Sequence, residues 1–142
     1  MKDQNVCKDL KGEINDKLMK GMDELIKYQL LLVEKIDQRM GSKQFQVLLD
    51  GNDGDRITLA YELLNCVHNE AEELRDWLPW KSWKKYPSYS LDENLPEIKM
   101  EIIDLFHFVT ELAICMKMTS EEISVMYDAK HKENLARQQR NY

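Results

Sequence analysis

Four carboxylates arranged in two pairs are the residues of this sequence best suited to chemistry. Glu70 and Glu73 are three residues apart, and Glu101 and Asp104 repeat that spacing further along the chain. Residues three apart in an α-helix share one face. If the two helices pack antiparallel, the carboxylates meet at the core margin, where like charges raise one another's pKa unless a cation lies among them. Such oxygen ligands suit Mg²⁺ or Mn²⁺.

A single Glu-x-x-Glu pair is weak evidence for a metal site, because such pairs are common on solvated helix faces. The segment between the two pairs adds a second signal, since it contains all three tryptophans and several lysines: Trp77, Trp80, Lys81, Trp83, Lys84 and Lys85. Tryptophan offers a flat face for stacking a base, and lysine offers a positive charge for a phosphate. The alternative is that the tryptophans only close the core where a helix ends.

A second basic cluster lies near the end of the sequence and comprises Lys130, Lys132, Arg137 and Arg140. Taken alone, it fits a solvated helix end, where cations interact favourably with the helix dipole. His107 follows Asp104 by one helical turn, beside the carboxylates, although a histidine there is more often a hydrogen-bonded core residue than a ligand. No phosphate-binding loop, dinucleotide-binding motif or catalytic triad is evident.

Helices must position these residues, because apolar residues recur at three- and four-residue spacings and do not alternate. We expect one helix ending near Met40, a second over about 56–77, a third from Pro96 with Asn94 as its cap, and a fourth from Thr119 toward Arg137. Residues 44–55 and 78–96 are expected to connect them. Thr119 and Glu122 form a capping box. The prediction is an all-α bundle of four to five helices, a single domain over residues 1–142.

The composition places the chain among soluble globular proteins, with 43% hydrophobic and 32% charged residues in 142 positions. The 26 acidic and 20 basic residues leave a formal charge of −6, which argues against binding of nucleic acid polymers. The longest aliphatic run, 30–33, is too short to span a membrane, and no signal peptide is apparent. Three widely spaced cysteines favour a reducing cytoplasm. The wide apolar stripes predict a homodimer.

These motifs together resemble a known superfamily. Glu70-x-x-Glu73 followed, after residues 74–100, by Glu101-x-x-Asp104 is similar to the metal-binding signature of the all-α nucleoside triphosphate pyrophosphatases, which include the dimeric dUTPases and MazG-like enzymes. Within that superfamily the chain looks more like the dCTP pyrophosphatases/dUTPases of T-even bacteriophages. The likeness is carried by the stretches 80–85, 97–108 and 133–142. It covers about residues 69–142 well and is fainter around Tyr28-Gln29.

The resemblance implies Mg²⁺-dependent hydrolysis of deoxypyrimidine triphosphates, dUTP and/or dCTP, to the monophosphate and pyrophosphate. It also implies a homodimer, in the host cytoplasm if the chain is encoded by a phage. Two or three Mg²⁺ ions, with Mn²⁺ as an alternative, would be bound by Glu70, Glu73, Glu101 and Asp104. Glu70 would also be the catalytic residue that orients and deprotonates a water molecule.

The expected substrate contacts fall into two groups. Phosphate oxygens would be bound by Lys81, Lys84, Lys130, Asn134 and Arg137. By analogy with the family, the nucleoside would be contacted by Gln29 at the base edge, by Trp80 or Trp83 as a wall of the pocket, and by Phe106 and His107 against the deoxyribose. A bulky group packed against the sugar would exclude a 2′-hydroxyl. Tyr142, in the family's terminal motif, completes the expected set.

Two other functions stay open at this point. One is a MazG-like pyrophosphatase of broad (d)NTP specificity, which hydrolysis assays across the eight common (d)NTPs would identify. The other is a non-catalytic helical interaction module, whose acidic faces are solvated and whose apolar stripes bind a partner protein. The two carboxylate pairs occur together with two basic clusters, and this combination favours the enzyme.

Overall fold

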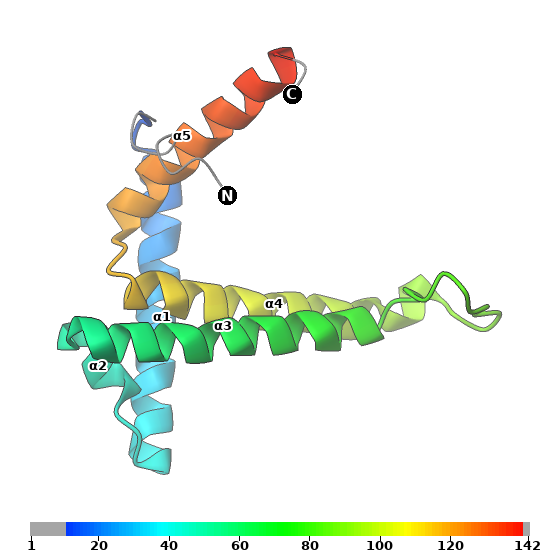
Figure 1. Ribbon diagram of the computed structural model, residues 1–142, viewed down its shortest axis with the longest axis horizontal. Coiled ribbons are helices and arrows are strands. Elements are labelled where there is room, and N and C mark those ends of the chain that lie inside the picture. The colour runs from blue at the N-terminus through cyan, green and yellow to red at the C-terminus, as the bar shows by residue number, and fades with distance from the viewer. Residues whose placement is uncertain (1–10, 141–142) are drawn as a thin grey trace. The chain divides into compact units, whose positions relative to one another are not determined.

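The computed structural model describes residues 11–140, and this part of the chain is helical without any strand (Figure 1). Its helices are α1 (Asp16–Met40), α2 (Gln44–Asp50), α3 (Asp53–Asp76), α4 (Leu91–Cys115) and α5 (Ser120–Gln139). The all-α prediction is therefore confirmed. None of these helices combines the length and the apolar character needed to cross a membrane.

The chain divides into two compact units, which we describe separately. The central unit comprises residues 29–117, and the terminal unit comprises the described residues up to 28 and from 118 onward. Helix α1 contributes its first part to the terminal unit and its second part to the central unit. That residues 1–142 form a single domain stays a prediction.

In the central unit, α3 and α4 form an antiparallel hairpin, against which α2 packs (Figure 1). The buried core draws on α1, α2, α3 and α4 and consists of Val33, Leu48, Leu59, Leu63 and Cys115. Each fully buried aliphatic side chain of this kind contributes roughly 1.5–3 kcal/mol. Burial of the facing stripes of α3 and α4 therefore fixes which residues of the two helices lie opposite one another.

Side-chain caps mark where helices α3 and α5 start, as the local sequence dictates. Asn52 begins α3, because its side-chain oxygen accepts a hydrogen bond from the Asp55 backbone N–H at 2.8 Å. The predicted capping box of α5 is confirmed. Thr119 Oγ1 accepts from the Glu122 N–H, and the Glu122 carboxylate accepts from the Thr119 N–H, both at 3.1 Å.

Two predicted boundaries are wrong. Residues 44–55 do not form a connection, because α2 occupies residues 44–50 and α3 begins at Asp53. Phe45, Val47 and Leu48 belong to the core of the central unit, and this tertiary contact stabilises a helix too short to persist alone. The helix expected from Pro96 begins at Leu91, since Ser90 and not Asn94 caps it. Pro96 therefore lies inside α4, near its start.

A buried arginine joins three segments of the central unit. The Arg56 guanidinium donates to the carbonyl oxygens of Gly51 at 3.0 Å, Cys115 at 2.9 Å and Leu48 at 3.3 Å. In return, the Cys115 thiol donates to the Arg56 carbonyl at 3.3 Å. Arg56 is 6% exposed, and it satisfies the carbonyls that the ends of α2 and α4 leave without intrahelical partners.

In the terminal unit, the residues before α1 are hydrogen-bonded to α5. The Asn15 N–H donates to Ser124 Oγ at 2.8 Å, and the Glu13 N–H donates to Asp128 Oδ2 at 2.7 Å. Gly12 lies so close to α5 that a Cβ there would be 1.9 Å from the Val125 carbonyl oxygen. Only glycine permits this approach.

We predict that Arg56→Leu lowers the free energy of unfolding by about 2–4 kcal/mol, because three buried carbonyls lose their charged donor. Urea denaturation followed by circular dichroism measures the effect. The matched control is Arg39→Leu, at an exposed position in the last turn of α1, which should change stability by less than about 0.5 kcal/mol. Equal effects of the two substitutions would contradict the assignment.

Candidate active site

Three carboxylates from α3 and α4 meet in the central unit. Glu70, Glu101 and Asp104 each offer one oxygen atom, and these three atoms all lie within 4.8 Å of one another. The antiparallel hairpin causes this proximity, because it brings the second half of α3 beside the first half of α4. The expected meeting of carboxylates from two helices is thus observed for these three residues, which we call the carboxylate cluster.

Glu73, the fourth expected ligand, is not part of the carboxylate cluster. Its Oε1 accepts a hydrogen bond from Asn69 Nδ2 at 3.0 Å, within the same helix. Its charge still acts on the cluster, as one of the causes that raise the pKa of Glu70. A metal-binding role for Glu73 stays a prediction.

The electrostatics of the carboxylate cluster suit a divalent cation. Burial raises the pKa of Glu70, and the charges of Glu73, Asp104 and Glu101 raise it further. Glu101 Oε2 is buried without a hydrogen-bond partner among the described residues, and no ion pair of residues 11–140 involves the cluster. A buried oxygen of this kind, among three carboxylates of like charge, is a ligand that Mg²⁺ or Mn²⁺ would satisfy. The residues present therefore fit such an ion.

A cavity of about 340 Å³ adjoins the carboxylate cluster, and Asp104 belongs to both. Its wall combines apolar side chains such as Leu63 with more polar ones, which include Gln29, Glu62, Cys66, His107 and Glu111. Ligand pockets usually measure roughly 300–1,000 Å³, so this cavity can accommodate part of a nucleotide-sized ligand. Burial raises the pKa of the Cys66 thiol, and the charges of Glu111, Glu70 and Glu62 add to that effect.

Three side chains of the cavity wall form a hydrogen-bonded chain. Gln29 Nε2 donates to Glu111 Oε2 at 3.1 Å, and Gln29 Oε1 lies 2.8 Å from His107 Nδ1. Gln29 and Glu111 are each 3% exposed. The structure thus brings Gln29 and His107 together beside Asp104. Phe106, by contrast, is 55% exposed and does not line the cavity.

Glu111 is a residue of this cavity that the motif spacing does not reveal. One signal in the sequence could have found it: an acidic side chain in the otherwise mostly apolar stretch 108–115, one helical turn after His107. Burial raises the pKa of Glu111, while the hydrogen bond from Gln29 opposes the rise. Its second oxygen, Oε1, is buried and has no partner within the described part of the chain.

The connection between α3 and α4 groups the aromatic and basic residues. The rings of Trp80 and Trp83 meet edge to face at 5.9 Å between centroids. The Arg75 guanidinium lies 4.3 Å from the Trp80 ring, and Lys81 Nζ lies 5.4 Å from it. Trp83 is 76% exposed, so its ring is accessible for stacking. Lys84 Nζ lies 5.3 Å from the Tyr86 ring.

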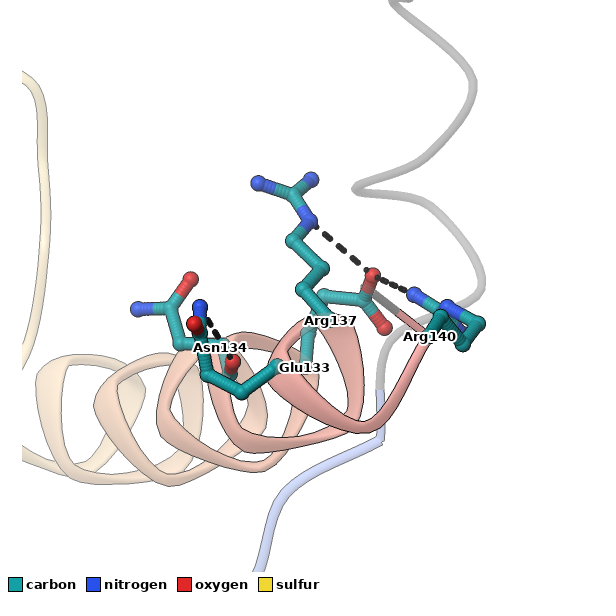
Figure 2. A network of polar contacts seen from close by, with 5 residues as sticks. Glu133, Asn134, Arg137 and Arg140 are labelled. Carbon is teal, nitrogen blue, oxygen red and sulfur yellow. Dashed lines mark hydrogen bonds and ion pairs between the residues drawn. The ribbon is translucent and has the colours of Figure 1, made fainter. Parts of the chain in front are cut away.

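The remaining expected contacts lie on α5, in the terminal unit. Lys130 and Asn134 are exposed. The Glu133 carboxylate accepts hydrogen bonds from both Arg137 and Arg140 (Figure 2). The distances to Oε1 are 3.1 Å from Arg137 Nε and 2.7 Å from Arg140 Nη2. These contacts, that of Arg140 first, lower the pKa of Glu133. Arg137 and Arg140 thus share one carboxylate partner, and the binding of phosphate by Lys130, Asn134 and Arg137 stays a prediction. Tyr142 lies outside the described residues.

Fold and site define an all-α protein with a candidate metal centre on a helical hairpin. A family model described as dUTPase matches residues 21–123, and the chain belongs to this family. The match includes the carboxylate cluster and the cavity. It confirms the resemblance to the all-α nucleoside triphosphate pyrophosphatases, as do the phage relatives that share similarity with the chain.

Two of these relatives are named dCTP pyrophosphatase. That of Enterobacteria phage T4 is 32% identical over 109 residues, which cover 63% of this chain and 64% of the relative. That of Enterobacteria phage LZ5 is 41% identical over 95 residues, which cover 62% and 55%. A phage T4 protein named DNA replication protein is 31% identical over 99 residues, 56% of this chain and 25% of that protein. Each match spans less than two thirds of the relative. No solved structure gives a significant match.

We predict that the metal-free protein loses stability as pH rises from the ordinary glutamate pKa of 4.5 through the raised pKa of Glu70. Because the folded state binds this proton more tightly than the unfolded state, its contribution is present below that range and lost above it. Glu70→Gln should flatten this part of the Tm profile, and adding Mg²⁺ at neutral pH should raise the Tm of the wild type.

The control for this experiment is Glu97→Gln, which removes an exposed carboxylate of α4 one turn before Glu101. It should leave both the pH profile and the Mg²⁺-induced rise in Tm unchanged. If Glu97→Gln and Glu70→Gln had the same effect, general surface charge and not the carboxylate cluster would be responsible.

Proposed function

We propose that this chain hydrolyses a deoxypyrimidine triphosphate, dCTP and/or dUTP, to the monophosphate and pyrophosphate in a Mg²⁺-dependent reaction. The observation that carries the proposal is the convergence of Glu70, Glu101 and Asp104 beside a cavity. Membership of the dUTPase family supports a nucleotide substrate, and the name dCTP pyrophosphatase borne by two relatives supports a pyrimidine base and cleavage to pyrophosphate.

The carboxylate cluster would hold two or three Mg²⁺ ions, or Mn²⁺, with Glu73 as the fourth expected ligand. Once bound, the ions would neutralise charge on the triphosphate and make water at the site easier to deprotonate. The unpartnered Glu101 Oε2 supports this assignment, because a coordinated cation would satisfy it. In a chain with a formal charge of −6, a bound cation would also favour the approach of an anionic substrate.

Glu70 is the residue that we assign to orienting the attacking water and accepting its proton. The charges of Glu73, Asp104 and Glu101 all raise the pKa of Glu70, so its carboxylate interacts with each of the other three acids. A positioned carboxylate acting as general base contributes roughly 10²–10⁴-fold to a rate. Glu101, Asp104 and Glu73 are assigned chiefly to metal binding.

Basic residues would bind the triphosphate, and the cavity would bind the nucleoside. Lys81 and Lys84 of the central unit, with Lys130, Asn134 and Arg137 of the terminal unit, are assigned to phosphate oxygens. The exposed ring of Trp83, or that of Trp80, would stack on the base. Gln29 is assigned to the base edge. His107 and Phe106 are assigned to the deoxyribose, where bulk excludes a 2′-hydroxyl.

We also propose that the chain acts as a homodimer in the cytoplasm. Ile57, Tyr61 and Leu64 recur at helical spacing on α3 and are all exposed, Tyr61 by 68%. An apolar stripe of this kind on a monomer would be unfavourable, and a second copy would bury it. A reducing compartment fits the free thiols of Cys66 and Cys115.

We predict that the purified protein hydrolyses dCTP or dUTP with release of pyrophosphate, and that EDTA stops the reaction until Mg²⁺ is restored. Glu70→Gln should lower kcat by about 10²–10⁴-fold while the protein stays folded, because the general base is lost. Steady-state kinetics across the eight common (d)NTPs measure the activity and its specificity.

The matched control is again Glu97→Gln, which should retain wild-type kcat. Similar kcat/KM for purine and pyrimidine triphosphates would instead identify a broad MazG-like enzyme. If the wild type gave no turnover, and calorimetry with Mg²⁺ and a non-hydrolysable nucleotide gave no heat, the chain would be an interaction module.

We predict that sedimentation equilibrium gives twice the chain mass of 16.9 kDa. Tyr61→Glu should shift the protein toward the monomer, because it places a charge in the apolar stripe of α3. Met126→Glu, at an exposed apolar residue of α5, is the control and should leave the mass unchanged. A monomeric wild type at all concentrations would refute the dimer.

A further inference from the structure

Glu111 is a buried acid whose place in the cavity wall is not accounted for by metal binding or by packing. It lies seven residues after Asp104 on α4 and is 3% exposed. An apolar residue would be buried there without cost, whereas a carboxylate loses its hydration. Its contact with Gln29 recovers part of that cost, and Oε1 has no partner within residues 11–140. We therefore ask how the Glu111 carboxylate affects the side chains that it contacts, beginning with Gln29.

The Glu111 carboxylate fixes which way the Gln29 amide points. In its ionised form the carboxylate only accepts hydrogen bonds and so selects the amide NH₂ group, which agrees with Nε2 lying 3.1 Å from Oε2. The Gln29 carbonyl oxygen must then face the opposite way, toward His107 Nδ1 at 2.8 Å. A glutamine at position 111 could either donate or accept and would leave both orientations of the Gln29 amide open.

The orientation of Gln29 in turn fixes the tautomer of His107. A carbonyl oxygen only accepts, so Nδ1 must carry the proton that it donates to Gln29 Oε1. In the neutral ring, Nε2 is then without a proton and accepts a hydrogen bond. Because His107 lines the cavity, a ligand there meets an acceptor where the other tautomer would offer a donor.

We propose that Glu111 is a positioning residue that, through Gln29, holds His107 in the Nδ1–H tautomer and so makes the cavity select a ligand group that donates a hydrogen bond to Nε2. This inference rests on the proposed function for the identity of the ligand. A deoxypyrimidine nucleotide offers such a donor on its base, as the cytosine 4-amino group or the uracil N3–H, and on its sugar, as the 3′-hydroxyl.

The other charged groups around the cavity do not replace Glu111 in this task. Glu62 on α3 and Asp104 on α4 also line the cavity, as does the Cys66 thiol, but the hydrogen bonds of Gln29 go to Glu111 and His107. Asp37 on α1 acts on Glu111 only through its charge, which adds to burial in raising the Glu111 pKa. The chain Glu111–Gln29–His107 therefore takes its direction from the acceptor oxygen of Glu111 at one end.

The first test measures the tautomer directly in the metal-free, ligand-free protein. Two-bond ¹H–¹⁵N correlation spectra distinguish Nδ1–H from Nε2–H in a neutral histidine, and the His107 signals are assigned by their loss in His107→Asn. The wild type should show Nδ1–H, and Glu111→Gln, which keeps the side-chain shape, should show a mixture of tautomers. Glu62→Gln, a control at another acid of the same cavity, should keep Nδ1–H.

The second test measures recognition with dCTP, dUTP and 2′,3′-dideoxy-CTP. In Glu111→Gln, kcat/KM should fall by about tenfold for the substrate whose donor is read, as expected for one hydrogen bond. A fall confined to dCTP identifies the 4-amino group, and one confined to dUTP identifies N3–H. An equal fall for both that is absent with the dideoxy analogue identifies the 3′-hydroxyl.

Two results would overturn the inference. One is a wild-type His107 that carries its proton on Nε2 in the neutral ring, a measurement that needs no variant of Glu111. The other is a Glu111→Gln protein whose kcat/KM values for all three nucleotides equal those of the wild type. Failure of the proposed function is distinguishable, because the wild type would then hydrolyse no nucleotide although the tautomer could still be measured.

Discussion

The antiparallel packing of α3 against α4 is the constraint on which the rest of the site depends. Burial of apolar side chains such as Leu59 and Leu63 fixes how the two helices face each other. That arrangement brings Glu70 beside Glu101 and Asp104, although like charges repel. The free energy of core burial offsets this repulsion in the metal-free protein. A divalent cation bound there, as proposed, would reduce the repulsion and so stabilise this packing.

The distribution of charge explains how an acidic protein could act on an anionic substrate. The carboxylate cluster and the acids of the cavity wall lie together in the central unit. Lysines and exposed tryptophan are concentrated in the connection between α3 and α4. A metal ion bound to the cluster would reverse the local sign, and the lysines would then add to the attraction of phosphate. The net charge of −6 conceals this separation.

Ligand specificity, in our proposal, depends on another buried carboxylate, that of Glu111. Within residues 11–140 the cluster carboxylates form no ion pair and would suit a cation, whereas Glu111 accepts a hydrogen bond from the Gln29 amide and, in our proposal, fixes the orientation of that amide. The Gln29 amide has one donating group and one accepting group. If Glu111 accepts from the NH₂ group, the carbonyl oxygen is the group that faces His107. Glu101 and Asp104 of the cluster lie on the same helix as Glu111, α4, so the proposed metal binding and ligand recognition would share this helix.

The sequence by itself determined the features that depend on local spacing. Those are the helical class, the capping box of Thr119 and the pairs of acids on one face of α3 and of α4, because a helix places residues three apart together whatever surrounds it. Only the tertiary structure decided that α2 is a helix, that Glu70 and not Glu73 joins Glu101 and Asp104 in the cluster, and that Glu111 is buried against Gln29. Those outcomes depend on contacts between residues far apart in the chain, and a helical repeat contains no information about which side chains from another helix will lie opposite.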